Sequence, residues 1–453
     1  MKSQTELSHD HVTINIDNKL SKLPDAHQEP FIFKVFERYR KQNKRAYEPE
    51  LLAIGPYNRS KTVLIQTMEE HKLRYLQLLL TRRGESSVKR YVEAIRGDEE
   101  KARRCYATVF GLDKDQFVEL LVVDGLFIVE LCRKFSDGNL VDKHDMIFKL
   151  NWIHHVLWRD MLLFENQIPF FVVEKLFKMT RSHEEESGDH DLVDLLLNYY
   201  CSIRKYYHYH TKSLGNNKWL LESVKHVKSQ NLKHVLALIH LLTTSSFTED
   251  PLNYNKIQDN KELKWEFIAS ITELHETGIK FKAKHDCCLF NVTFANGTLE
   301  IPLLTIEEKT EGLLRNMIAY EQCQDEKRPR VINDYTTLLY CLIKSSKDVG
   351  LLRKYGILNN LIGDDESASK VVSGLSGSVF VSHDGFCYKD VFNGVNEYYR
   401  QRRHIWAANL SRNYFNTPWA IISFIAAVVL LFLTFTQTLT AVIPFFGHSP
   451  PSS

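Results

Sequence analysis

The sequence has little net charge and few of the residues that mark specialised classes of protein. Its 58 Lys and Arg residues against 56 Asp and Glu leave a formal net charge of +2, which argues against a dedicated nucleic-acid-binding protein. With only 19 Gly and 12 Pro in 453 residues, collagen-like and low-complexity chains are excluded. The hydrophobic content of 44% is that of a globular protein, because a mostly disordered chain has fewer apolar residues.

Cysteine is too sparse for a disulfide scaffold, and the common catalytic motifs are missing. The eight Cys residues include no C-x-x-C pair, so we expect reduced thiols. The sequence has no P-loop, no G-x-S-x-G turn, no H-E-x-x-H zinc motif and no EF-hand loop. His285 and Cys287 share one face of a predicted strand but supply two ligands where zinc needs three or four. We therefore predict no metal and no cofactor, and an enzyme is the less favoured class.

The strongest pattern in the sequence lies near its C-terminal end. No Asp, Glu, Lys or Arg follows Arg412, and residues 419–443 are mostly apolar. A helix of this length spans roughly 37 Å, more than the hydrocarbon core of a bilayer at about 30 Å. A helix of the same length in a soluble core normally carries a charged residue. We predict a transmembrane helix over 419–443, followed by a short tail over 444–453.

The charges beside this span predict its orientation. Arginines precede the span, whereas no Lys or Arg follows it, so the positive-inside rule places the large domain in the cytoplasm. Residues 1–30 are polar and lack the apolar core of a signal peptide, which predicts a disordered N-terminal segment and a single-pass, tail-anchored protein. The length of the span favours the plasma membrane over the thinner endoplasmic reticulum bilayer. The residues expected to flank the membrane are Arg400, Arg402, Arg403, Arg412 and Trp419.

The remainder of the chain is predicted to be mainly α, forming a large helical domain over 31–412 with a lobe boundary near 215–261. Apolar residues recur at helical spacing in many segments. Between 279 and 304 the apolar pattern alternates instead, and Asn296-Gly297 supplies the residues of a tight turn, so we expect a small antiparallel hairpin or sheet there. The segments with helical spacing include 63–83, 88–109, 146–158, 192–209, 265–276 and 310–323.

Charged residues occur unexpectedly within the most apolar part of the sequence. A carboxylate buried there must be paired or must change its pKa. The favoured interpretation is structural, with Arg159 neutralising a neighbouring carboxylate inside the core. The alternative is an acid/base site, which requires these charges to converge in a pocket. The candidate buried charge cluster consists of Asp124, Arg159, Asp160 and Glu165.

Basic residues are concentrated near the beginning of the large domain. A solvated face is the ordinary interpretation of such a cluster. The alternative is contact with anionic lipid at the cytoplasmic membrane surface. The cluster consists of Lys34, Arg38, Arg40, Lys41, Lys44 and Arg45.

Six segments have distinctive sequences and follow one another along the chain. They are AYEPELLAIGPYN (46–58), EEHKLRYLQLLLTR (69–82), VVDGLFIVEL (122–131), RDMLLFENQIPFFVVEKLF (159–177), GTLEIPLLTIEEKTEGLLRNMIAYEQC (297–323) and YFNTPWAIISFIAA (414–427). In this order they resemble the plant family called "domain of unknown function 247", over residues 31–443. The chain departs from the family at Val35-Phe36, where Val-Pro is usual, and at Phe164, where Leu is usual.

The resemblance implies a largely helical, single-pass plant protein without an established activity, and it transfers no catalytic residue. Some members of the family are linked to pollen–stigma recognition. We therefore predict a membrane-anchored, non-enzymatic protein-interaction, signalling or recognition module, with protein partners and no nucleic acid. The first alternative is a membrane-bound enzyme with an unrecognised active site. The second is a recognition protein at the cell surface, suggested by glycosylation sequons at Asn58, Asn291, Asn296 and Asn409.

Overall fold

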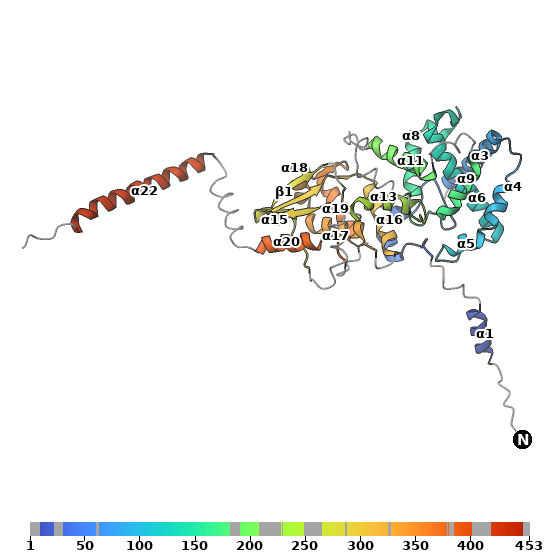
Figure 1. Ribbon diagram of the computed structural model, residues 1–453, viewed down its shortest axis with the longest axis horizontal. Helices are drawn as coiled ribbons and strands as arrows, with labels where there is room; N and C mark the ends of the chain where they lie inside the picture. The colour runs from blue at the N-terminus through green and yellow to red at the C-terminus, as the bar shows by residue number, and fades with distance from the viewer. Residues whose placement is uncertain are drawn as a thin grey trace, which may run out of the picture. The chain divides into compact units, whose positions relative to one another are not determined.

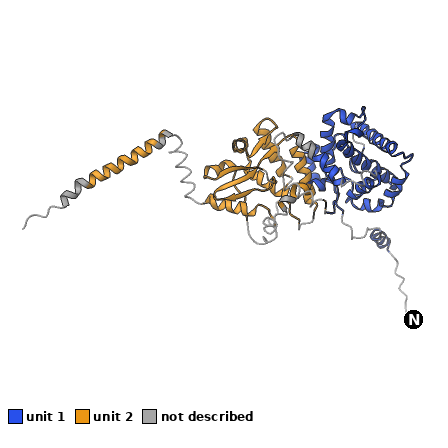
Figure 2. Ribbon diagram, turned by 45° about the horizontal axis from the view of Figure 1, so that its top comes forward, with its two compact units in different colours: residues 1–210, 230–239 blue, residues 211–229, 240–453 orange. Residues whose placement is uncertain are grey.

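The structure, a computed structural model, is mainly helical with small sheets, as the sequence predicts (Figure 1). Its residues form two compact units, Met1–His210 with Gln230–Ile239, and Thr211–Ser229 with His240–Ser453 (Figure 2). The predicted domain limits stay predictions, because much of the stretch between 208 and 264 lies outside the described residues. The structure describes residues 10–21, 30–59, 63–181, 191–207, 228, 230–248, 265–285, 288–324, 328–377, 379, 385–400 and 418–446.

The first unit is built around one long helix, α6 (Lys114–Ser136), which packs against α3, α4, α9 and α11. Its apolar residues from Phe117 to Cys132 are buried on every side, which explains why the sequence pattern has no polar face. Asp113 caps the helix, since its carboxylate accepts the N–H of Gln116 at 2.8 Å. The other helices of the unit are α1 (His11–Leu20), α2 (Glu37–Gln42), α3 (Val63–Arg83), α4 (Lys89–Arg96), α5 (Glu99–Arg104), α7 (Met146–Lys149), α8 (Asn151–Met161), α9 (Phe170–Thr180) and α11 (Leu192–Tyr207), with short 3-10 turns η1 (Lys44–Tyr47) and η2 (Gly138–Leu140).

The second unit holds the strands. The predicted hairpin is present, with β2 (Thr293–Ala295) antiparallel to β3 (Thr298–Pro302) across the Asn296-Gly297 turn. β1 (Lys280–Lys284) pairs with the other edge of β3 and runs parallel to it, so the sheet is mixed rather than wholly antiparallel. β4 (Leu304–Ile306) and β5 (Leu358–Asn360) form a separate parallel pair that the sequence did not indicate.

The second unit also contains helices, and the one expected over 310–323 is present as α16 (Thr310–Gln322). The others are α15 (Ile271–Glu276), α17 (Val331–Leu342), α18 (Ser346–Lys354), α19 (Asp365–Ser376), α20 (Lys389–Arg400) and the long apolar α22 (Pro418–Phe446). Of α13 (Val235–Thr248), residues 235–239 belong to the first unit and 240–248 to the second.

Several predicted boundaries are wrong for local reasons. The helix expected over 88–109 is interrupted at Gly97-Asp98, which separates α4 from α5, and the one over 146–158 is interrupted at Leu150. The helix expected over 265–276 begins only at Ile271, because Ser270 forms a capping box with Glu273. Helix α1 lies within residues 1–30 and its side chains are all exposed, so the prediction that this segment is disordered stays a prediction. The first turn of α1 closes through a hydrogen bond from the Ile14 N–H to the Asp10 carbonyl.

The hairpin turn provides a first test of the fold. Gly297 has a φ of +72°, and a Cβ placed there would lie 2.7 Å from the ring of Tyr398. We expect Gly297→Ala to lower the free energy of unfolding by about 2 kcal/mol, because it adds both backbone strain and a clash. Gly312→Ala in α16 is the matched control, since nothing lies within 4 Å of its Cβ position and it should stabilise the helix by about 0.5–1 kcal/mol. Urea denaturation compares the two variants, and equal shifts would contradict the role of the turn.

Candidate functional site

The candidate charge cluster lies in the core of the first unit, beside a segment without regular secondary structure, Glu48–Gly55. Leu51, Leu52, Ala53 and Ile54 are buried. Their backbone N–H and C=O groups therefore need hydrogen-bond partners within the protein. Side chains bind this segment and the neighbouring stretch at Val35, and we call them the core polar network: Lys72, Asp124, Arg159, Asp160, Glu165 and Asn166.

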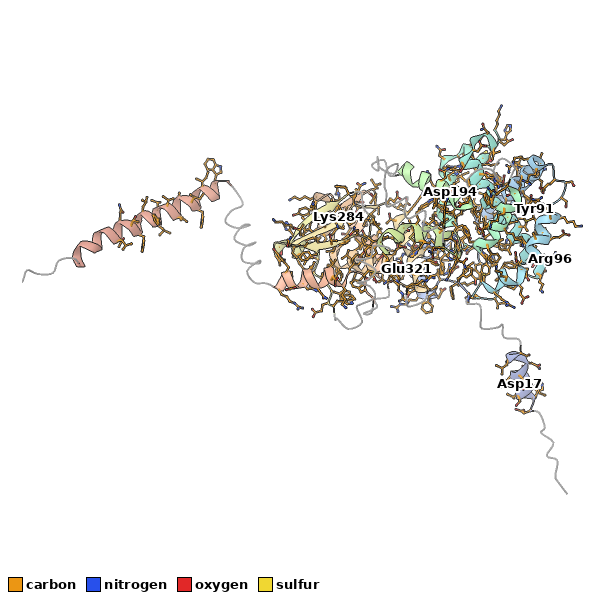
Figure 3. The ribbon with its side chains drawn as sticks, in the orientation of Figure 1. Asp17, Tyr91, Arg96, Asp194, Lys284 and Glu321 are labelled. Atoms are coloured by element: carbon orange, nitrogen blue, oxygen red, sulfur yellow. The ribbon has the colours of Figure 1, made fainter. Side chains whose placement is uncertain are left out.

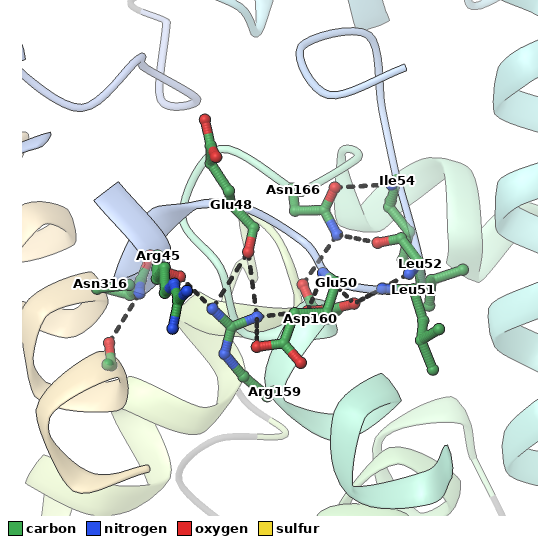
Figure 4. A network of polar contacts seen from close by, with 12 residues as sticks. Arg45, Glu48, Glu50, Leu51, Leu52, Ile54, Arg159, Asp160, Asn166 and Asn316 are labelled. Atoms are coloured by element: carbon green, nitrogen blue, oxygen red, sulfur yellow. Dashed lines mark hydrogen bonds and ion pairs between the residues drawn. The ribbon is translucent and has the colours of Figure 1, made fainter. Parts of the chain in front are cut away.

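Asp160 binds the centre of the segment from the last turn of α8 (Figure 4). Its carboxylate accepts the backbone N–H of Glu50 at 3.0 Å, of Leu51 at 2.8 Å and of Leu52 at 2.9 Å. Burial raises the pKa of Asp160 to about 6, while hydrogen bonds from Leu52 and Leu51 and the charge of Arg159 oppose this rise. Three N–H donors and the Arg159 guanidinium stabilise the ionised form of this carboxyl.

Arg159 joins this carboxylate to the beginning of the same segment. Its Nη1 lies 2.7 Å from Asp160 Oδ1, and the guanidinium also donates to the carbonyl of Glu48 at 3.1 Å and to the carbonyl of Arg45. One cation thus neutralises Asp160 and binds two backbone carbonyls that precede Glu50, as Figure 4 shows.

Asn166 and Asp124 bind the last part of the segment. The Asn166 amide accepts the N–H of Ile54 at 2.7 Å and donates to the carbonyl of Leu52 at 2.7 Å. Asp124, from the middle of α6, accepts the N–H of Gly55 at 2.9 Å and pairs with the Lys72 ammonium at 2.6 Å. Lys72 also donates to the carbonyl of Ala53.

Glu165 binds a different stretch of the chain, which precedes Glu48. Its Oε1 accepts the N–H of Val35 at 2.6 Å, and its Oε2 pairs with Arg40 of α2. The three carboxylates of the predicted cluster thus bind backbone groups at separate positions between Val35 and Gly55. Since their oxygens are already engaged with N–H groups and cations, this geometry favours the structural interpretation over an acid/base site.

The backbone at Gly55 packs closely against the backbone at Gln167. The φ of Gly55 is +71°, and a Cβ there would lie 2.4 Å from the carbonyl oxygen of Gln167, which also accepts a hydrogen bond from the Tyr106 hydroxyl at 3.0 Å. The Gln167 amide in turn donates to the carbonyl of Met161 at 2.7 Å and accepts the N–H of Leu236 at 3.2 Å. The run Glu165-Asn166-Gln167 therefore binds three separate parts of the first unit.

The predicted membrane-flanking residues are only partly described. Arg400, at the end of α20, forms an exposed ion pair with Glu266 at 2.6 Å. Trp419, in the first turn of α22, is exposed. Arg402, Arg403 and Arg412 lie outside the described residues.

Sequence reasoning missed a second group of buried charges, in the other unit. Glu321 of α16, labelled in Figure 3, accepts the N–H of Ile332 at 3.0 Å and of Asn333 at 2.8 Å and so caps α17; the His240 ring lies 2.8 Å away. Asp334 accepts the N–H of Cys387 at 2.8 Å, and burial raises its pKa to about 7. The available signal was the same as for Asp124, an acidic residue within an apolar helical segment.

The chain is thus a mainly helical protein with buried charges that bind irregular backbone and with one long apolar helix, α22. The sequence model of the DUF247 family, described as "Plant protein of unknown function", matches residues 32–433, so the chain belongs to this family, as its resemblance indicated. The UPF0481 protein At3g47200 of Arabidopsis thaliana is 28% identical over 434 residues, covering 92% of this chain and 87% of the relative. The putative UPF0481 protein At3g02645 of the same plant is 24% identical, covering 92% and 90%. No solved structure matches.

Removing Asp160 tests the core polar network. Asp160→Ala leaves three N–H groups, two of them buried, without their acceptor, and we expect the free energy of unfolding to fall by at least about 3 kcal/mol. Asp160→Asn keeps one acceptor oxygen and should lose less. Urea denaturation measures the loss, and amide hydrogen exchange of residues 50–55 should accelerate first.

Asp115→Ala is the matched control for this experiment. Asp115 forms an exposed ion pair with Arg96, which is labelled in Figure 3, and its loss should change stability by less than about 1 kcal/mol. Equal destabilisation by the two alanine variants would show that Asp160 has no special role.

The pKa of Asp334 generates a pH-dependent prediction. Because the folded-state pKa of about 7 exceeds the unfolded value near 3.8, the contribution of Asp334 is fully present below about pH 4 and is lost as the pH rises to about 7. Asp334→Asn removes this dependence, so the stability of the wild type relative to this variant should fall by up to about 1.4 kcal/mol per pH unit over that range.

Urea denaturation from pH 5 to 7 measures this slope. Asp348→Asn is the control, because hydrogen bonds from Thr272 and Ser345 outweigh burial and lower the pKa of Asp348. Its stabilising effect is present above its unfolded pKa and is lost only at lower pH, so this variant should retain the wild-type slope from pH 5 to 7. An unchanged slope in Asp334→Asn would contradict the assignment.

Proposed function

We propose that this protein is a single-pass membrane protein whose folded units act as a non-enzymatic module for interaction with other proteins, in signalling or recognition. The observation that carries the proposal is the length and apolar character of α22. The helix has 29 residues, and within it Ile422–Leu439 is, among the described residues, the stretch long and apolar enough to cross a membrane.

The exposure of α22 supports a membrane role over a role in a soluble core. None of the stretch Ile422–Leu439 is buried, and Leu431 and Phe432 are 70% and 67% exposed. A contiguous apolar surface of this kind is unfavourable in water, whereas a bilayer removes it from water. At 1.5 Å per residue the helix extends roughly 43 Å, which is sufficient for a tilted span with both ends in the interfaces.

The charge distribution supports a cytosolic location for the two units. Arg400, Arg402, Arg403 and Arg412 precede α22, and no Lys or Arg follows it in this sequence. Positive residues beside a span are retained on the cytoplasmic side. The length of the span supports the plasma membrane over the endoplasmic reticulum, whose bilayer is thinner.

The core polar network supports a non-enzymatic role. The charges that made an acid/base site conceivable bind the backbone of residues 35–55 and are buried or partly buried. The partners we propose are proteins that bind the folded surface.

Glycosylation tests the topology. We expect a sequon added after Ser453 to be modified in plant cells, while Asn296 stays unmodified because it faces the cytosol. Asn296 is the suitable native reporter, since it is exposed in the hairpin turn, whereas Asn58 is fully buried and donates to the Glu165 carbonyl. Glycosidase-sensitive mass shifts give the readout.

Thr298→Ala is the control, because it removes this sequon and leaves Asn296 in its turn. A mass shift that disappears in Thr298→Ala would overturn the proposed orientation and favour recognition at the cell surface. A chain that alkaline carbonate extracts from membranes would overturn the anchor itself.

Proximity labelling tests the interaction role. The full chain and a fragment with residues 401–453 alone, each carrying the same labelling enzyme, should share general membrane neighbours. Partners specific to the folded units should appear only with the full chain, and identical partner sets would contradict the proposal.

A further inference from the structure

The first unit carries a basic face between Ile32 and Tyr47, which we define as Lys34, Phe36, Arg38, Lys41, Lys44 and Arg45. All six side chains are exposed, and they come from α2, from η1 and from the residues just before α2. Glu37 is the one acidic residue between positions 34 and 45. This face therefore combines five cations with an aromatic ring that is 67% exposed.

The other side of the same stretch is fixed to the core. Val35 is buried, and its N–H is bound by Glu165 at 2.6 Å. Arg40 points inward and pairs with the second oxygen of Glu165. Val35 and Arg40 thus fix this stretch to the core through Glu165, and the basic face is held in place before any partner binds.

The end of the basic face is fixed as well. Ala46 and Tyr47 are buried, and the Asn43 side chain accepts the N–H of Ala46 at 3.2 Å. Arg159 binds the carbonyl of Arg45, which leaves the Arg45 side chain exposed. A surface fixed in this way loses little backbone entropy when it binds.

We propose that the basic face binds the anionic lipid headgroups of the membrane surface, with Phe36 inserted among them. Its charge is complementary to the cytoplasmic leaflet, whose anionic lipids attract clusters of Lys and Arg. An exposed aromatic ring amid such cations has the chemistry of an interfacial anchor. This inference rests on the proposed function, which places the first unit on the cytosolic side of the membrane that holds α22.

Because α22 would anchor the chain in a membrane, we favour the lipid surface as the partner that binds the basic face. A chain with α22 in a bilayer keeps its other parts at a high effective concentration near the headgroups, so weak headgroup contacts become occupied. The same contacts should be sensitive to salt, because the potential of the leaflet decays over about 8 Å at physiological ionic strength.

Photo-crosslinking from position 36 tests the proposal. The full chain with p-benzoylphenylalanine in place of Phe36 is reconstituted into phosphatidylcholine vesicles with or without phosphatidylserine that carries an alkyne on its acyl chain. We expect a lipid adduct in the anionic vesicles at least about tenfold above that from the same photo-residue at Val109, which is 95% exposed but lies outside the basic face.

Charge removal gives the matched comparison. Arg38→Ser, Lys41→Ser, Lys44→Ser and Arg45→Ser together should reduce the adduct to the Val109 level. Four exposed cations elsewhere on the first unit, changed by Lys89→Ser, Lys114→Ser, Lys143→Ser and Lys149→Ser, should leave it unchanged. High salt should act like the first set of substitutions.

The outcomes test lipid binding by the basic face separately from membrane insertion of α22. An adduct no stronger than that at Val109, or one that survives removal of the four charges, overturns lipid binding by this face. In plant microsomes, an adduct to a protein in place of lipid would overturn it in favour of an acidic protein surface. Alkaline extraction of the same vesicles reports insertion of α22, so failure of the anchor is distinguished from failure of the basic face.

Discussion

The fold of the first unit depends on satisfying the backbone of one irregular, buried segment. Residues 50–55 form neither helix nor strand, yet their N–H groups are inside the protein, where an unpaired amide costs about 1–3 kcal/mol. Asp160, Asn166 and Asp124 accept five of these N–H groups, and Arg159 and Lys72 compensate the charges while binding backbone carbonyls. Buried charge here replaces the hydrogen-bond ladder that a sheet would provide.

The sequence revealed these charges but not their partners. Asp124, Asp160 and Glu165 could be recognised because each interrupts an apolar run, which is a local signal. The hydrogen bond from Glu50 to Asp160 joins residues 110 positions apart. The segment Glu48–Gly55 has no hydrophobic periodicity, so its sequence does not indicate that it is buried. The helix over Val63–Arg83 was predictable to the residue, because its contacts repeat every turn.

The second unit illustrates the same limit in its sheet and its charges. Asn296-Gly297 encodes the hairpin locally, and the hairpin is present. The parallel pairing of β1 with β3 depends on how the chain returns after Lys284, which no adjacent residue specifies. Glu321 likewise caps a helix that begins ten residues later, and its role emerges only when α16 and α17 are placed together.

The separation between the irregular segment and its acceptors also fixes an order of events during synthesis. Glu50 leaves the ribosome about 110 residues before Asp160, a delay of roughly 5–20 s at typical rates of elongation. During that interval the apolar run Leu51-Leu52-Ala53-Ile54 has neither its hydrogen-bond acceptors nor α8 beside it. The hydrogen bonds that close the core around this run can therefore form only after Asp160 and the Glu165-Asn166-Gln167 run have emerged.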